Sequence, residues 1–176
     1  MVIDAVAPAG WGALRFALNF MEDSVMSPEA LARPWCILEA QSEGRVFLPA
    51  LSSTLRHSAG TGRLLWVNVQ DRQKEKLTPK VIQLLLESGL CAGILLHGLE
   101  AFSKGQSPAL WGRRWQLASQ KGGTHLVWLH QKPHHVIGFD IRLEWQSQGI
   151  YEIKKGYGYF HEQRLKKALL TQSAAA

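Results

Sequence analysis

The chain has 176 residues, a formal net charge of +6, 46% hydrophobic residues and 19% charged residues. This length and composition suit one compact domain with a buried core, and they exclude a disordered or fibrous chain. No apolar run reaches the roughly 18 residues that a membrane-spanning helix needs, and residues 1–8 lack the basic start of a secretory signal. We therefore expect a cytoplasmic protein with no membrane partner.

The charge is unevenly distributed along the chain. From Lys104 onward there are eleven Lys or Arg and four Asp or Glu, a net charge of +7, whereas the first 103 residues hold nine bases and ten acids. A neutral front and a basic back favour an anionic partner for the back half. A basic surface that only solubilises the protein is the alternative.

The first expected element is an amphipathic helix in residues 10–22. Its apolar side chains recur at steps of three and four residues, at Trp11, Leu14, Leu18 and Met21. Such a stripe must be covered, so we predict that these four residues contact either the rest of the chain or a protein partner. Residues 27–29 (Ser-Pro-Glu) begin a second, short helix that ends before Pro34. We assign residues 1–34 to an N-terminal helical arm.

From residue 35 onward, apolar strand-like runs alternate with helical patterns. The expected strands are 35–40, 45–48, 64–69, 91–96 and 124–129, and the expected helices are 50–57, 78–88 and 110–121. This alternation predicts an α/β fold with a mostly parallel central sheet covered by helices on both faces. Residues 136–145 and 150–155 alternate apolar and polar side chains around a turn, which predicts a C-terminal antiparallel hairpin. The expected domain is 35–159, followed by a basic helix and tail at 160–176.

The junction at residues 43–55 (EGRVFLPALSSTL) lies where a nucleotide-binding α/β domain carries its phosphate loop. A phosphate loop needs glycines for close backbone approach and a lysine for the phosphates. There is no glycine between Gly44 and Gly60, and no lysine before Lys74. We therefore predict a degenerate loop that binds no nucleotide cofactor.

The order of these pieces resembles the RecA-like superfamily over roughly residues 44–159. In an active RecA-like ATPase the strand at 94–96 would end in a magnesium-binding aspartate, but His97 stands there. The run 47–51 (FLPAL) and the helix at 113–118 (RRWQLA) look like parts of two groups without ATP chemistry. One is the SulA group of division inhibitors, and the other is the ImuA group, which accompanies error-prone polymerases. The final hairpin and basic tail, residues 141–167, favour ImuA.

The resemblance implies a RecA-like three-layer fold and a non-catalytic accessory protein of the bacterial DNA-damage (SOS) response. Its expected partner is a translesion polymerase subunit or a RecA-like protein, and single-stranded DNA is a further candidate. The alternatives are a SulA-like inhibitor that binds a tubulin-like division protein, and a divergent ATPase. Because RecA-like domains commonly stack, a homo-oligomer is another expected arrangement.

The candidate contact site is a set of basic and aromatic residues in the back half. Basic side chains bind phosphates or acidic proteins, and exposed aromatic rings stack on unpaired bases. The predicted contacts are Arg113, Arg114, Lys132, Lys154, Lys155, Tyr157, Tyr159, Arg164, Lys166 and Lys167. We expect no catalytic residue, because the hydroxyls of residues 52–54 (Ser-Ser-Thr) are assigned no general base and lone carboxylates such as Asp71 and Glu100 lack a partner. We also expect no metal site, because His130, His134 and His135 have only Asp140 near them.

Overall fold

The computed structural model describes residues 1–7, 12–25, 33–40, 52–69, 79–97, 108–130, 139–147 and 150–156. Within them the chain folds as α/β, with one seven-stranded sheet in the order β3-β2-β4-β5-β1-β6-β7. The strands are β1 (Val2–Val6), β2 (Trp35–Ala40), β3 (Leu64–Val69), β4 (Gly93–His97), β5 (His125–His130), β6 (Ile141–Ser147) and β7 (Ile150–Gly156). The helices are α1 (Ala13–Val25), α2 (Ser53–Gly60), α3 (Pro79–Ser88) and α4 (Pro108–Gly122).

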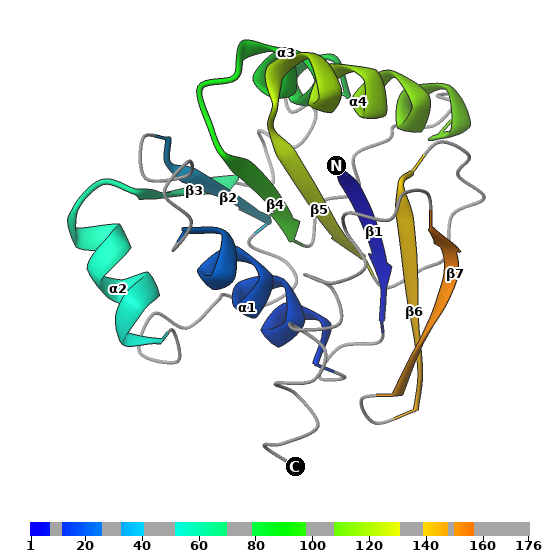
Figure 1. Ribbon diagram of the computed structural model, residues 1–176, viewed down its shortest axis with the longest axis horizontal. Coiled ribbons are helices and arrows are strands. Elements are labelled where there is room, and N and C mark those ends of the chain that lie inside the picture. The colour runs from blue at the N-terminus through cyan, green and yellow to red at the C-terminus, as the bar shows by residue number, and fades with distance from the viewer. Residues whose placement is uncertain are drawn as a thin grey trace.

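Six neighbouring strands, from β3 to β6 across the sheet, are parallel, and β7 runs antiparallel to β6 at one edge. Helices cover both faces of this sheet (Figure 1). One core lies between the sheet and α1 with α2, and includes Phe16, Phe20 and Leu55. The other core lies under α3 and α4, and includes Ile82 and Trp115. The predicted mostly parallel α/β sheet is therefore confirmed.

The N-terminal segment is not a separate arm. Residues 2–6 form β1, which lies in the sheet between β5 and β6 and pairs in parallel with both. Each residue of β1 is buried. No strand was predicted before residue 35, so the predicted boundary at residue 34 divides a single sheet. The prediction missed β1 because Asp4 interrupts its apolar run, whereas a buried parallel strand ordinarily has a continuous one.

Local signals place several helix ends. Pro79 opens α3, and Gly89 follows it with φ of +66°, a backbone conformation that glycine adopts without strain. The α2 helix begins at Ser53 rather than at residue 50, because the Ser52 hydroxyl accepts a hydrogen bond from the Leu55 N–H at 3.2 Å and caps it. The predicted strand at 45–48, most of the degenerate loop, the predicted short helix from residue 27 as far as residue 32, and the basic helix in 160–176 lie outside the described residues.

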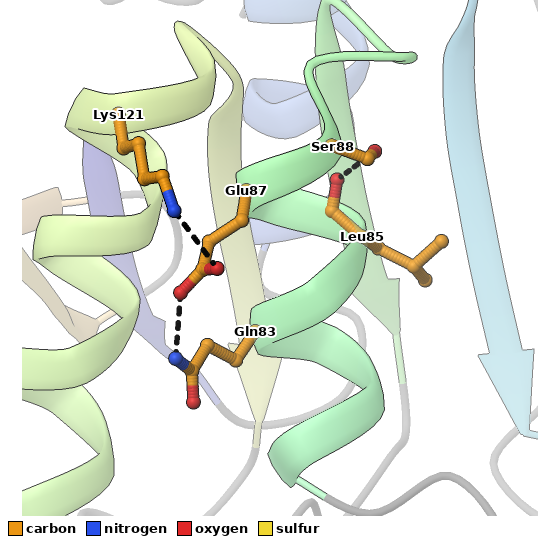
Figure 2. Close-up of polar contacts among 5 residues, drawn as sticks. All are labelled: Gln83, Leu85, Glu87, Ser88 and Lys121. Atoms are coloured by element: carbon orange, nitrogen blue, oxygen red, sulfur yellow. Dashed lines mark hydrogen bonds and ion pairs between the residues drawn. The ribbon is translucent and has the colours of Figure 1, made fainter.

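The helices α3 and α4 pack side by side and are joined at their C-terminal ends. Figure 2 shows the Glu87 carboxylate of α3 between two groups. The Gln83 amide of the same helix lies 2.6 Å away, and the Lys121 ammonium of α4 lies 3.4 Å away. The Arg33 guanidinium donates to the carbonyls of Gly89, Gly122 and Gly123 at 3.0 to 3.1 Å. One arginine thus binds carbonyl oxygens at the ends of both helices, where a positive charge is favourable.

This close approach predicts that Gly122→Ala destabilises the protein. A Cβ added at Gly122 would lie 1.9 Å from the Leu86 backbone carbonyl oxygen, so α3 and α4 would have to separate. Overpacking of this kind costs about 1–3 kcal/mol. Chemical denaturation should therefore show a lower unfolding midpoint. Gly60→Ala is the matched control, because nothing lies within 4 Å of its added Cβ. Equal stability of the two variants would contradict the packing described here.

Candidate functional site

The carboxyl ends of the parallel strands form the edge of the sheet where α/β proteins bind their ligands. In the described residues two clusters of polar side chains lie on opposite faces of the sheet. His130, Glu39 and His97 are at or next to the carboxyl ends of β5, β2 and β4, whereas Asp4 is central in β1 and Arg142 is the second residue of β6. The Asp4 cluster consists of Asp4, His130, Arg142 and Glu144. The Glu39 cluster consists of Glu39, Trp66 and His97.

The Asp4 cluster lies on the face covered by α3 and α4. Asp4 alternates with Ile3 and Ala5, which face the other core, and it is fully buried. One carboxylate oxygen of Asp4 contacts the His130 Nε2 from β5. Its other oxygen lies 3.4 Å from the Arg142 Nε of β6, which also lies 2.9 Å from a Glu144 carboxylate oxygen. The cluster therefore joins β5, β1 and β6 through a buried carboxylate.

The His130 side chain packs against aromatic residues. Its imidazole ring lies 4.4 Å from the Trp128 ring, centroid to centroid. Trp128 in turn meets Trp115 of α4 edge-on at 5.7 Å. The side chain of His130 is only 5% exposed. An Asp–His pair of this kind can orient a general base, but general-base chemistry requires a substrate within hydrogen-bond reach. The buried ring favours a structural role.

The Glu39 cluster lies on the face covered by α1 and α2. Glu39 is buried at the end of β2, and its two carboxylate oxygens have different partners. The Trp66 indole N–H donates to one at 3.1 Å, and the His97 Nδ1 lies 3.1 Å from the other. His97, which the sequence analysis placed at the position of a lost magnesium ligand, is thus held by a carboxylate from the neighbouring strand.

Two of the predicted basic contact residues are described with their side chains, and both lie exposed on α4. The Arg113 guanidinium donates to the Gln116 amide oxygen, and the Arg114 guanidinium lies over the Trp111 ring at 4.8 Å from its centroid. Gln116 links Arg113 to the buried Asp140, because the Gln116 side-chain amide donates a hydrogen bond to the Asp140 carboxylate at 2.5 Å. Asp140 also accepts the Val2 backbone N–H at 2.7 Å.

The rest of the predicted basic and aromatic set is not brought to this helix by any described contact. Lys154 and Lys155 belong to β7, whose backbone alone is described. The remaining members lie outside the described residues: Lys132, Tyr157, Tyr159, Arg164, Lys166 and Lys167. Their predicted role as contacts for nucleic acid or an acidic partner stays a prediction.

The apolar stripe predicted on the first helix packs largely inward. Met21 is fully buried, and Leu14 and Leu18 pack partly buried against the core. Trp11 lies outside the described residues. The helix also buries Phe16 and Phe20, which shifts its buried face from the predicted one. Met21 therefore cannot reach a partner, and the exposed parts of Leu14 and Leu18 are the only described portions of the stripe that can.

The local surroundings shift the pKa values of two thiols and one carboxyl group, so that the thiols of Cys36 and Cys91 are neutral and the Glu87 carboxylate is charged at neutral pH. Burial raises the pKa of the Cys36 thiol to about 12, and burial also raises the pKa of the Cys91 thiol. Neither thiol is a nucleophile at neutral pH. The hydrogen bond from Gln83 lowers the pKa of the Glu87 carboxyl, and Lys121 adds to this. Among the described residues, no group of three or more His, Cys, Asp and Glu side chains is arranged to hold a metal ion.

Comparisons with known proteins assign no family to this chain. No protein-family model matches it, and no curated protein matches its sequence. Within the described residues, none of the helices combines the length and the apolar character needed to cross a membrane.

Sequence reasoning missed the buried members of both clusters. Asp4 and His130 are 126 positions apart, and Glu39 and His97 are 58 apart, so no local spacing connects them. The available signal was a single acid within an apolar strand: Asp4 in Val-Ile-Asp-Ala-Val and Glu39 in Trp-Cys-Ile-Leu-Glu-Ala. A carboxylate at such a position requires a partner from another strand, because an isolated buried charge is costly.

Proposed function

We propose that this chain is a non-catalytic RecA-like accessory protein of the bacterial DNA-damage response. In this proposal it acts through protein contacts with a translesion polymerase complex, in the manner of the ImuA group. The motifs at residues 47–51 and 113–118 and the mostly parallel sheet support this assignment.

One observation carries the non-catalytic part of the proposal. The two described histidines at the carboxyl ends of β4 and β5, His97 and His130, each contact a buried carboxylate of a neighbouring strand. Asp4 and Glu39 are the buried acceptors of these pairs. Their partners come from neighbouring strands, so these carboxylates already contact other side chains of the sheet before any ligand arrives.

We expect no ATP hydrolysis and no tight nucleotide binding. Without glycines or a lysine at residues 49–54, the β- and γ-phosphates would lack both a backbone nest and a counter-charge. Isothermal calorimetry of the purified chain with Mg-ATP should show no binding at micromolar concentration. A micromolar dissociation constant would instead favour the divergent ATPase.

The choice between the two RecA-like groups depends on the tail. An ImuA-like role should require residues 157–170, with Tyr157 and Tyr159 and the basic side chains of that segment, whereas a SulA-like role should not. We expect a chain truncated after residue 156 to lose its contribution to damage-induced mutation in cells. Cell filamentation caused by both the full and the truncated chain would favour the division inhibitor.

A further inference from the structure

The outer face of α4 carries an uninterrupted exposed stripe along the helix. The exposed positions follow helical steps of three and four residues: Leu110, Arg113, Arg114, Leu117, Gln120 and Lys121. On the opposite side of α4, Trp115 and Ala118 are buried in the core. The α4 face, defined by these six residues, is therefore a continuous surface on a rigid element.

The α4 face is apolar at two points and basic between them. Leu110 and Leu117 are 52% and 49% exposed, which is high for large apolar side chains in a folded domain. They are seven positions apart in sequence, so they lie about 10 Å apart along the helix axis. Arg113 and Arg114 lie between them on the same face. Two apolar contacts thus flank a pair of guanidinium groups.

The two arginines carry charge that their described contacts do not neutralise. Arg113 donates to an amide and Arg114 lies over an indole ring, and both of these partners are uncharged. Lys121 differs, because the Glu87 carboxylate of α3 lies 3.4 Å away. The centre of the α4 face therefore has a net positive charge, and both guanidinium groups keep N–H donors for carboxylate oxygens.

We propose that the α4 face is a docking surface for an acidic, amphipathic protein segment. Carboxylates at the middle of the segment would pair with Arg113 and Arg114, and apolar side chains about two helical turns apart would cover Leu110 and Leu117. Nucleic acid fits less well, because a phosphate backbone pairs with the arginines but gives the two leucines nothing apolar to contact. The inference deepens the proposed function, since it identifies the chemistry of the protein partner.

Site-specific photo-crosslinking in DNA-damaged bacterial cells tests this surface. The full-length chain carries p-benzoylphenylalanine at position 117, and a control chain carries it at position 84, where Leu84 is exposed on α3. Mass spectrometry then identifies the crosslinked segment. We expect a segment rich in Asp and Glu from position 117 and much less of it from position 84. Crosslinks mainly to nucleic acid, a segment without an excess of acids, or equal yields from both positions would overturn the proposal.

Capture alone does not support the proposal, so a synthetic peptide of the captured segment is then titrated with purified protein by fluorescence anisotropy. Arg113→Gln with Arg114→Gln, and separately Leu110→Ser with Leu117→Ser, should each weaken binding at least tenfold. Lys80→Gln, an exposed lysine on α3, is the matched control and should bind as the wild type. Unchanged binding by either double variant at unchanged melting temperature would also overturn it.

The identity of the captured protein tests the proposed function separately. An acidic segment that requires both arginines, from a protein outside translesion synthesis, would support the docking surface and reject the proposed function. A polymerase subunit crosslinked equally from both positions would support the proposed function and reject the docking surface.

Discussion

A chain that lacks residues 1–23 should fail to fold. Deletion removes β1, an interior strand of the sheet that pairs with β5 and β6. It also removes the buried aromatic residues Phe16 and Phe20 of α1. The deletion would expose the apolar inner faces of the sheet and leave two strands with unpaired edges. Circular dichroism and thermal denaturation should show no cooperative transition, and most of the protein should be insoluble.

Two point variants within residues 1–23 compare the loss of unfolding free energy at a buried and at an exposed position. Ile3→Ala removes a fully buried side chain from β1 and should cost about 2–5 kcal/mol of unfolding free energy. Arg15→Ala, on the exposed side of α1, should change stability by less than about 0.5 kcal/mol. If the fragment 24–176 were soluble and melted at the full-length temperature, residues 1–23 would be a removable arm after all.

The second large effect is expected from Asp4→Ala. The substitution leaves His130 and Arg142 without the carboxylate that lies between them, and both are mostly buried. Removing one partner of a buried ion pair costs about 3–5 kcal/mol. Arg142 keeps Glu144 at 2.9 Å, so the cost falls mainly on the buried His130 and the expected loss is about 3 kcal/mol. For a domain of marginal stability, a loss of this size consumes much of the total. Urea denaturation monitored by tryptophan fluorescence measures it directly.

Glu144→Gln is the matched control within the same cluster. Its side chain is 30% exposed, so solvent already screens its ion pair with Arg142 and the loss should be below about 1 kcal/mol. If the two variants were equally stable, Asp4 would not be the centre of the cluster. If Asp4→Ala abolished a measurable activity while stability stayed at the wild-type level, the pair with His130 would instead be a functional site.

Sequence patterns predicted the elements whose signals are local. Pro79 and Gly89 marked the ends of α3, and the apolar runs at 35–40 and 64–69 became β2 and β3 with the predicted bounds. These predictions succeeded because proline fixes φ and glycine permits positive φ at their own positions, and because apolar and β-branched runs bounded by turn residues favour strands.

Site residues were harder to predict than strands. Arg113 and Arg114 were predicted as contacts because they are basic residues of the basic back half, and the structure has both exposed on α4. Their role as contacts stays a prediction. Leu110 and Leu117 are not among the predicted contact residues, because a repeat of apolar side chains does not say which face the domain will cover. Only the packing of Trp115 and Ala118 against the sheet shows that Leu110 and Leu117 remain exposed.

The sequence by itself determined that the chain forms an alternating α/β domain with a basic back half and no recognisable phosphate-binding loop. The tertiary structure alone decided that β1 lies between β5 and β6, and that Asp4 meets His130 from a strand 126 positions away. The physical reason is that local patterns report the conformation of a few neighbouring residues. Strand order and charge pairing depend on which distant apolar faces pack together, and that is settled only by the whole fold.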